Sequence, residues 1–576
     1  MDRTAWIAVT LCVIALVGWE WWIAKQAPPR PAIISASPTP AGAVAQPNAT
    51  PAAPLTAAAP SPTAVPVATI PPSEVSIQKL SNADVELELT NAGGGIAKTT
   101  LRNHKAEGDT PVVLNAYSNT PIGAIIENPA EPAIQKYTVE PSGGDAVQFT
   151  YKTPQALTIR KKFFFPKTNE KTDNFIVELD IDLANEGSAP FTNAGYYVAL
   201  GSAAPIHPKD YSYYTRMVWY LDSKAKGIDV NRFGGSGGFL GTGIGAQMAQ
   251  QFFQQPTPNA EWAAVSDQFF TTMIVPLTAK ADGVWARRID IAPEQKVYAL
   301  EGALHMPTLQ IAPGQTQTAR FEIYAGPKIY HRLAQLEHNE AEVMDFGIFK
   351  IVSQFLLNFM NWLHGLLWQN YAAAILALTT VIRLVLWPLQ SKANRSMRQT
   401  AVLAPKMQEL REKYKDDPTR MNQEVMKMYK EYGINPVGGC LPMMIQIPIF
   451  FGLYKMLSQA VELRNAKFFW VHDLSQPDTV AHLPVLGWPI NIIPLCMAAT
   501  QIWLMQMTPK TGDPTQRRIM MFTPLIFLFI CYNFAAALAL YYTTQNLFSI
   551  LQFYLNKKQP MPTLEKVSVA KRKQNR

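Results

Sequence analysis

An arginine inside an apolar run places the strongest constraint on how this chain can fold. The run reads AAAILALTTVIRLVLWPL, from Ala372 to Leu389, and it is apolar enough to lie in lipid although it contains Arg383. A charge at the centre of a membrane helix costs about 2.5–3.5 kcal/mol on insertion scales, so it usually marks a functional site. The alternative is that the side chain reaches a nearby interface, because Gln390 and Lys392 follow closely.

Composition divides the chain into a membrane part and a soluble part. Of 576 residues, 48% are hydrophobic and 16% are charged, whereas typical soluble domains have about 25% charged residues. This charge deficit is concentrated in the C-terminal half. The net charge of +8 gathers near the ends of apolar runs, which favours a membrane surface over a nucleic acid as its partner.

The cysteines exclude a disulfide framework in the soluble part. All four lie in or beside apolar runs, and none falls between Val13 and Gly439: Cys12, Cys440, Cys496 and Cys531. No CxxC pair or cysteine–histidine cluster is present, so we expect no metal site. The sequence also has no nucleotide-binding motif, and we expect no cofactor.

The N-terminal region predicts an anchor followed by a tether. Residues 1–24 contain an apolar run with an aromatic belt and no convincing cleavage site after it, so we expect a retained transmembrane anchor rather than a cleaved signal peptide. Residues 25–72 are dominated by Pro, Ala, Thr and Ser. That composition cannot bury a core, so it predicts an extended, disordered tether.

Residues 73–345 alternate with period two and predict a large antiparallel β-sandwich. Val85, Leu87 and Leu89 alternate with glutamates, and the same pattern recurs in Val177–Leu183 and around Phe321. The glycine-rich stretch Arg232–Gly245 matches no phosphate-loop spacing and is interpreted as a loop. No residue of this region indicates catalysis, and His104 and His207 lack any partner pattern.

Residues 346–365 predict an amphipathic helix. Apolar residues recur at helical spacing, with Lys350, Gln354, Asn358 and Asn361 on the other face. The helix precedes an apolar run, which favours a position in the membrane interface over a core helix of the soluble domain.

A basic helical hairpin is expected at residues 391–433. Asp417 and Pro418 separate its two amphipathic helices, as an N-cap and a first helical residue, and Gly433 ends the second. The methionine stripes could contact a substrate adaptably or simply pack the two helices together, through Met407, Met421 and Met428. The basic content assigns the hairpin to the cytoplasm.

The apolar runs predict six spans in total. Five follow the anchor within residues 366–556, at about 371–389, 437–460, 486–507, 519–534 and 536–555. The last long run is divided in two, with a turn near Asn533–Ala536, because two spans keep the basic tail 557–576 in the cytoplasm. Both termini are then cytoplasmic, and the large domain is periplasmic.

These features together resemble the YidC/Oxa/Alb family of membrane protein insertases, in the Gram-negative form with a large periplasmic domain. The strongest match is NPVGGCLPMMIQIPIFFGLYKML (Asn435–Leu457) followed by VELRNAKFFWVHDLS (Val461–Ser475), together with TTVIRLVLWPLQSKA (Thr379–Ala393). One departure is NFAAALALYY (Asn533–Tyr542). The family's turn before the tyrosine pair is usually of Pro-Ser-Gly type.

The resemblance implies a hydrophilic groove in the inner membrane with Arg383 as its positive charge. The groove would let the tail of a client pause while its apolar segment moves into lipid. The candidate groove residues are Arg383, Thr379, Gln446, Gln501, Tyr541 and Tyr542. For the polar residues among them, hydrogen bonding between helices is the alternative interpretation.

The resemblance also implies partners and a function that is not enzymatic. Clients would be nascent membrane proteins, inserted, folded and assembled alone or with the Sec translocon. The basic tail could contact the ribosome or anionic lipids. A secondary transporter would show paired internal repeats, and none is visible. A membrane enzyme would need a nucleophile, an acid–base pair or a metal cluster at suggestive spacing. An assembly scaffold predicts the same topology and stays open.

Overall fold

The computed structural model describes residues 74–140, 145–166, 173–208, 210–235, 248–367, 369–433, 441–484, 487–508 and 514–557. The expected anchor, the tether, most of the glycine-rich loop and the basic tail after Lys557 lie outside these residues. The chain divides into two compact units, which are described separately. The first holds the described residues up to Asp267 and Thr271–Gly326, and the second holds Gln268–Phe270 and everything after Gly326.

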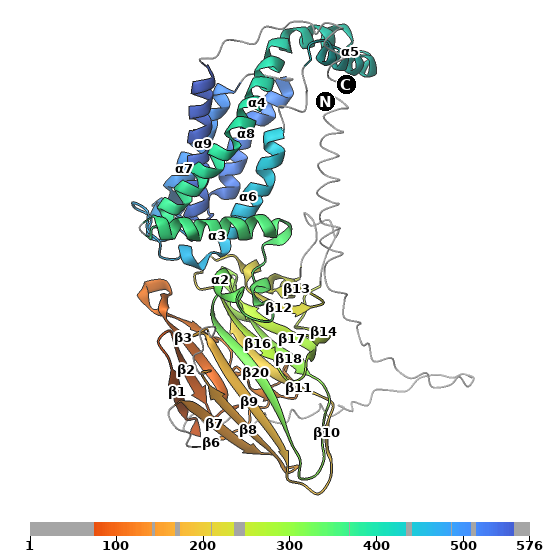
Figure 1. Ribbon diagram of the computed structural model, residues 1–576, viewed down its shortest axis with the longest axis vertical. Helices are drawn as coiled ribbons and strands as arrows, with labels where there is room; N and C mark the ends of the chain where they lie inside the picture. The colour runs from red at the N-terminus through yellow and green to blue at the C-terminus, as the bar shows by residue number, and fades with distance from the viewer. Residues whose placement is uncertain are drawn as a thin grey trace, which may run out of the picture. The chain divides into compact units, whose positions relative to one another are not determined.

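The first unit is an antiparallel β-sandwich (Figure 1), as the alternating pattern predicts. Its largest sheet has nine strands in the order β13-β12-β15-β16-β20-β9-β8-β7-β6. These strands are β13 (Lys224–Asp229), β12 (Arg216–Leu221), β15 (Trp262–Ser266), β16 (Phe270–Pro276), β20 (Thr316–Pro327), β9 (Ile176–Asn185), β8 (Leu157–Phe164), β7 (Ala146–Lys152) and β6 (Thr138–Glu140).

Three smaller sheets complete this unit. A five-stranded sheet has the order β14-β17-β18-β11-β5, a four-stranded sheet has the order β1-β2-β3-β4, and β10 pairs with β19. The bounds are β14 (Phe252–Ala260), β17 (Ala281–Ala292), β18 (Val297–Met306), β11 (Tyr196–Ala203), β5 (Ile125–Ile126), β1 (Ile77–Ser81), β2 (Val85–Thr90), β3 (Gly95–Lys105), β4 (Pro111–Leu114), β10 (Phe191–Asn193) and β19 (Leu309–Ile311).

The core of the sandwich follows the alternation read from the sequence. Every apolar residue of the Val85–Leu89 and Val177–Leu183 alternations is buried, while the acidic residues between them are not. The five-stranded and nine-stranded sheets approach closely at Gly302 of β18. A Cβ atom there would lie 2.8 Å from Val265 Cγ1, so only glycine fits this point of contact.

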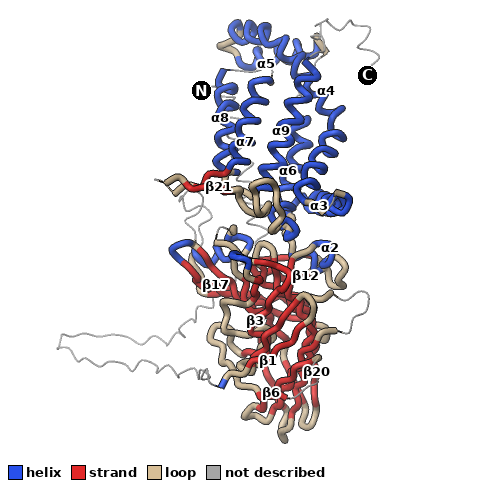
Figure 2. Tube along the Cα trace, turned by 90° about the vertical axis from the view of Figure 1, so that its left-hand side faces the viewer, coloured by secondary structure: helices blue, strands red, loops and turns tan. Residues whose placement is uncertain are grey.

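The second unit is helical (Figure 2). A short helix α2 (Tyr330–Leu333) precedes α3 (Lys350–Leu366), α4 (Tyr371–Lys413), α5 (Pro418–Glu431), α6 (Leu441–Gln459), α7 (Ile492–Met507), α8 (Pro514–Cys531) and α9 (Ala536–Lys557). Helix α9 packs along α4 and α7, α3 packs against α6 and α4, and α5 returns along the end of α4. A hairpin of β21 (Thr479–His482) and β22 (Pro489–Asn491) lies in the connection between α6 and α7.

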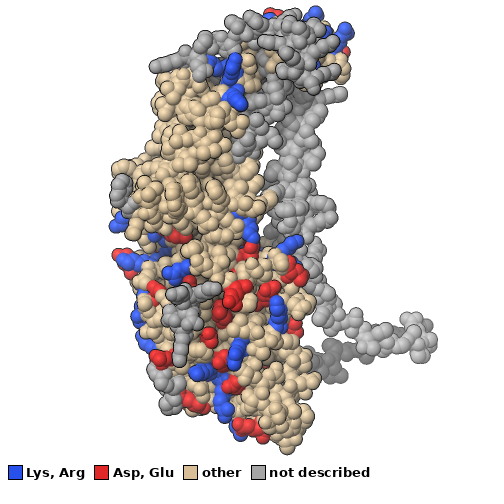
Figure 3. Space-filling view, in the orientation of Figure 1, with Lys and Arg blue, Asp and Glu red and all other residues tan. Residues whose placement is uncertain are grey.

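Among the described residues, one helix is both long and apolar enough to cross a membrane. It is α4, whose best 18-residue window has a mean hydropathy of 2.0, while α7 and Phe522–Cys531 of α8 form shorter apolar helices. Six spans therefore remain an expectation. Between its two ends, the visible face of the helical unit is nevertheless almost free of charged side chains (Figure 3).

Several element bounds differ from those read from the sequence. Helix α8, for example, runs over Pro514–Cys531 instead of about 519–534. The expected span 371–389 and the first arm of the hairpin form one continuous helix, α4, which contains both Pro388 and Pro405. Helix α7 begins at Ile492, because Pro489–Asn491 belong to strand β22. The segment after Gly326, which the sequence assigned to the β-sandwich as far as residue 345, belongs to the helical unit and forms α2 and a 3-10 turn at Glu340–Val343.

Candidate functional site

Arg383 lies on α4 and is partly buried. Its electrostatic neighbours are Tyr541 and Tyr542, both on α9. Neither tyrosine carries a charge at neutral pH. Among the residues that the structure describes, no carboxylate forms an ion pair with Arg383. Among the described residues, the positive charge of Arg383 is therefore not compensated by a carboxylate.

Gln446 of α6 connects this arginine-bearing region to a third helix. Its side-chain Nε2 donates to the Tyr541 hydroxyl at 3.3 Å and to Gln545 Oε1 at 3.1 Å. Gln446 therefore joins α6 to α9 at the level of Tyr541. We call the residues Arg383, Gln446, Tyr541, Tyr542 and Gln545 the arginine cluster.

The polar side chains of α9 continue this cluster along one face of the helix. Tyr541, Gln545, Ser549 and Gln552 recur every three or four residues and are all buried. The Gln552 amide donates to the backbone oxygen of Trp387 at 3.2 Å and to Ser391 Oγ at 3.0 Å, both on α4. Gln545 and Gln552 were not predicted from the sequence as members of this site. Their helical spacing within the apolar run 536–555 was the available signal.

Tyr542 faces a different environment from Tyr541. Its ring packs against Phe450 of α6 with centroids 5.2 Å apart and against Phe527 of α8 with centroids 5.0 Å apart. One edge of the arginine cluster is therefore an aromatic wall contributed by three helices. A polar and an apolar surface meet where α9 carries its tyrosine pair.

Two of the candidate groove residues do not join the cluster through hydrogen bonds. Thr379 is buried, and its hydroxyl donates to the backbone oxygen of Ile375 at 2.7 Å within its own helix. Gln501 of α7 has a buried Oε1 atom with no hydrogen-bond partner among the described residues. The neighbouring link between α7 and α9 is instead made by Asn546, which donates to Thr500 Oγ1 at 3.2 Å.

The methionines of the hairpin lie between its two arms. Met428 is buried with Leu403 and Tyr429, and Met407 packs against this group. The Tyr429 hydroxyl also contacts Met407 Sδ at 3.3 Å. Met421 is only partly buried. Met407 and Met428 thus contribute to packing, which was one of the two roles open for them.

A cation surrounded by neutral hydrogen-bonding groups favours an anion but provides no covalent chemistry. The arginine cluster contains no nucleophile paired with a base. Within the described ranges, no group of three or more His, Cys, Asp or Glu residues could hold a metal ion. The arrangement is suited to transient binding of a carboxylate or another polar segment.

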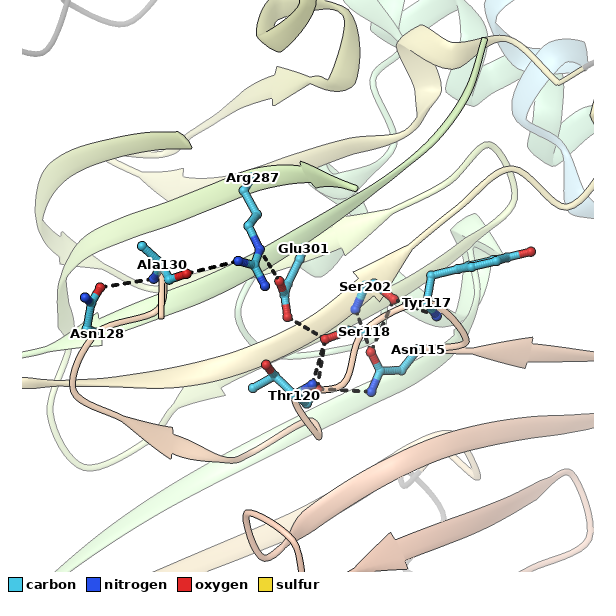
Figure 4. A network of polar contacts seen from close by, with 9 residues as sticks. All are labelled: Asn115, Tyr117, Ser118, Thr120, Asn128, Ala130, Ser202, Arg287 and Glu301. Carbon is cyan, nitrogen blue, oxygen red and sulfur yellow. Dashed lines mark hydrogen bonds and ion pairs between the residues drawn. The ribbon is translucent and has the colours of Figure 1, made fainter. Parts of the chain in front are cut away.

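A second polar network occurs in the β unit (Figure 4), and it is structural. The Glu301 carboxylate accepts from Arg287 Nε at 2.7 Å and from the Ser118 hydroxyl, while Arg287 also donates to the Ala130 oxygen at 3.1 Å. The contacts of Ser118 and Ala130 tie the segment 115–130 to the five-stranded sheet, and the Arg287–Glu301 pair lies within that sheet. The network is internally satisfied, as buried polar groups in a stable core must be.

Two family models match the chain. One is described as the 60Kd inner membrane protein and matches residues 362–563, and the other is the YidC periplasmic domain and matches residues 78–359. Together they reach from the first strand of the β unit to the end of the described helices.

Named relatives match both parts of the chain. A protein of Nitratidesulfovibrio vulgaris (strain DP4) named membrane protein insertase YidC is 30% identical over 591 residues, covering 96% of this chain and 98% of the relative. A protein of the same name from Syntrophobacter fumaroxidans is 37% identical over 305 residues, covering 52% of this chain and 53% of that protein. A solved structure of an active YidC insertase covers 84% of this chain and 94% of its own, with 18% identity and a TM-score of 0.35.

Proposed function

Because the chain belongs to the YidC family of membrane protein insertases, we propose that it inserts client segments into the membrane past the arginine cluster. The clients are nascent membrane proteins of the inner membrane. The family has an insertase activity and not a catalytic one, so the work of this chain is binding and release. The proposal assigns that work to Arg383 and its neutral neighbours.

The transmembrane arrangement that we propose has six spans. An anchor in residues 1–24 and five spans in residues 366–556 place both termini in the cytoplasm. The basic hairpin supports this orientation, because lysine and arginine favour the cytoplasmic side of spans. The β unit is then periplasmic, and α3 lies in the periplasmic interface of the inner membrane. Exposed apolar residues on α3, including Ile351, Phe355 and Trp362, support its position there.

Arg383 would lower the cost of bringing a client carboxylate into the membrane. Two opposite charges 4 Å apart attract by about 4 kcal/mol at an effective dielectric constant of 20, against about 1 kcal/mol in water. The client's polar tail would pause beside Arg383 while its apolar segment moves between helices into lipid. Burial of that segment in hydrocarbon drives the step, and no nucleotide is needed.

Polar residues around Arg383 would keep the site wet and adaptable. Gln446, Gln545 and Tyr541 present amide and hydroxyl groups that can exchange partners with a passing backbone. Thr379 and Gln501 complete the proposed groove on α4 and α7.

The hairpin would receive the nascent chain, with Met407, Met421 and Met428 supporting its shape. The Sec translocon, the ribosome and anionic lipids are the proposed further partners.

The observation that carries this proposal is the uncompensated charge of Arg383. A structural arginine in a helical bundle is normally paired with a carboxylate, because an unpaired buried charge is costly. Within the described part of the chain, the electrostatic neighbours of Arg383 are hydroxyl groups instead. A charge kept without a resident partner is suited to a partner that arrives and leaves.

The test is insertion into liposomes that contain only the purified protein. A single-span client with a short acidic tail is added, and protease protection of that tail is scored for the native protein, Arg383→Ala and Arg383→Lys. We expect Arg383→Ala to lose most of the protease protection of the tail and Arg383→Lys to retain part of it. If the purified protein protects no more tail than empty liposomes, it acts as an assembly scaffold. If Arg383→Ala inserts the acidic tail as well as the native protein does, the charge has no role in insertion.

A further inference from the structure

The connection between α6 and α7 carries a tight turn with two aromatic residues at its end. Phe468 and Val471 hydrogen-bond to each other in both directions, with N–O distances of 2.9 and 2.7 Å. The two residues between them are Phe469 and Trp470, which we call the aromatic tip. The Phe469 side chain is 83% exposed, and Trp470 is also exposed.

The backbone at Phe469 makes this exposure harder to explain by chance. Its φ is +48°, in the left-handed region that a bulky side chain rarely adopts. Glycine or asparagine would form this turn without strain. A strained position that carries an exposed aromatic ring points to a role outside the fold of the turn itself.

Hydrogen bonds connect the aromatic tip and the residues that follow it to the beginnings of α7 and α9. The Trp470 indole donates to Asp478 Oδ2 at 3.3 Å, and the same oxygen accepts from the backbone of Ile493 in the first turn of α7 at 2.7 Å. Nearby, the backbone of Ala537 at the start of α9 donates to Leu474 at 3.0 Å. The tip therefore stays at a fixed depth relative to α7 and α9.

Further exposed apolar side chains lie in the connection between α6 and α7 and on α8. Trp488, next to strand β22, is 66% exposed. The hydroxyl of Tyr532, directly after α8, donates to the Pro489 oxygen at 2.7 Å. On α8 itself, Phe529 and Ile530 are also exposed. The aromatic groups thus border a helix surface that faces lipid in the proposed arrangement.

Helix α3 presents its exposed apolar stripe at the same end of the helical unit. In Figure 2, β21 and α3 lie at that end on opposite sides of the unit. A single protein partner would cover one side. A bilayer surrounds the unit and reaches both sides at one level, where tryptophan and other aromatic residues are favoured.

We propose that the aromatic tip and Trp488 insert into the outer interface of the bilayer and form a second anchor, separate from α3. This inference rests on the proposed transmembrane arrangement. Lys467, which precedes the tip and is exposed, would lie among the lipid headgroups. The anchor would hold the beginnings of α7 and α9 at a constant depth while a client passes.

The first test measures the depth of the tip in nanodiscs of phosphatidylcholine and phosphatidylglycerol at three to one. The full chain, with its four cysteines replaced by serine, carries a single Phe469→Cys labelled with an environment-sensitive dye. The matched control is Gln315→Cys, an exposed position in the β19–β20 turn. Lipids with a nitroxide near the top of the acyl chain should quench the dye at 469 at least two-fold and leave the dye at 315 unchanged. Equal quenching at both positions would overturn the proposal and leave a protein partner as the occupant.

The second test moves the dye away from the tip, so that Phe469 itself can be varied. The dye is placed at Lys467→Cys in chains with Phe469 or with Phe469→Asn, a residue that the turn accepts without strain. Quenching at 467 should fall at least two-fold in the variant, and unchanged quenching would contradict an anchoring role for Phe469. Client insertion is measured in the same nanodisc lipids. If the compared positions or variants are quenched equally while client insertion is intact, only the proposed anchor is contradicted. If the native chain does not insert the client, the proposed function is contradicted.

Discussion

At the scale of single residues, the two units differ in the groups that surround a positive charge. Lys161 of β8 is fully buried and donates to the backbone oxygens of Gly93, Gly94 and Gly123 at 2.9, 3.1 and 3.0 Å. All three of its donors are satisfied by fixed atoms of the fold. Arg383 in the helical unit has no comparable set of acceptors among the described residues. The first cation is structural, and we propose that the second is available to a client.

Replacing Lys161 with methionine should destabilise the β unit. The three backbone oxygens would lose their donor inside the core, which costs about 2–4 kcal/mol. Hydrogen–deuterium exchange of β8 in the full chain measures the loss of protection. Lys162→Met, at the exposed neighbouring position, is the control and should change protection little.

The stability of the β unit should increase with pH between 7 and 9. Burial lowers the pKa of Lys161 from 10.5 to about 7. The unfolded state therefore binds one more proton than the folded state between these two values, so stability rises with pH in that window. We expect a gain of about 2 kcal/mol in the free energy of unfolding from pH 7 to pH 9. Lys161→Met should lack this gain, and a native protein that loses stability over the same range would contradict the assignment.

At the scale of elements, local patterns in the sequence predicted individual strands and some helix starts correctly. The alternation of Val85–Leu89 predicts a half-buried strand, and β2 has that burial pattern. Asp417 was expected to cap the second hairpin helix, and its side chain accepts from the backbone of Arg420 at 3.0 Å. Such features depend on neighbouring residues only.

Features that depend on distant contacts could not be predicted. Helix α4 continues through Pro388 and Pro405, although a proline in a helix interior costs about 3 kcal/mol and usually marks an end. Tertiary packing along α9 outweighs that local preference. Gln545 was missed for a related reason, since its role appears only when α6 supplies Gln446. Thr379 shares a face with Arg383 as expected, but its hydroxyl is used by its own backbone.

Removing the Asp417 cap should loosen α5 alone. Asp417→Ala leaves the first-turn amide of Arg420 without an acceptor, which costs about 1 kcal/mol. Amide exchange in the first turn of α5 should become roughly five-fold faster. Asp416→Ala removes the adjacent exposed carboxylate and serves as the control. Equal effects of the two variants would show that charge, and not capping, matters.

Gln446 and Gln545 should be energetically coupled within the membrane. Their hydrogen bond of 3.1 Å links α6 to α9, and such bonds contribute about 0.6 kcal/mol on average in double-mutant cycles. The cycle uses Gln446→Met, Gln545→Met and the double variant, with unfolding measured in a bilayer. Strictly additive effects would mean that the two side chains do not interact there.

At the scale of the whole molecule, the proposed insertion route requires the β unit and the basic hairpin to lie on opposite sides of the membrane. Single cysteines at Lys415, between α4 and α5, and at Gln315 in the β unit report the two sides. In intact spheroplasts, a membrane-impermeant maleimide should label position 315 and should reach position 415 only after lysis. Labelling of position 415 in intact cells would reverse the proposed orientation.

Reversing the charge at position 383 and the charge of the client tail tests whether Arg383 guides insertion by attracting negative charge. Insertion into liposomes is compared for native protein and Arg383→Glu, each with a client whose tail carries two aspartates or two lysines. We expect Arg383→Glu to reduce insertion of the acidic tail at least ten-fold, equivalent to about 1.4 kcal/mol, and to favour the basic tail instead. Equal insertion of the acidic tail by both proteins would contradict the claim.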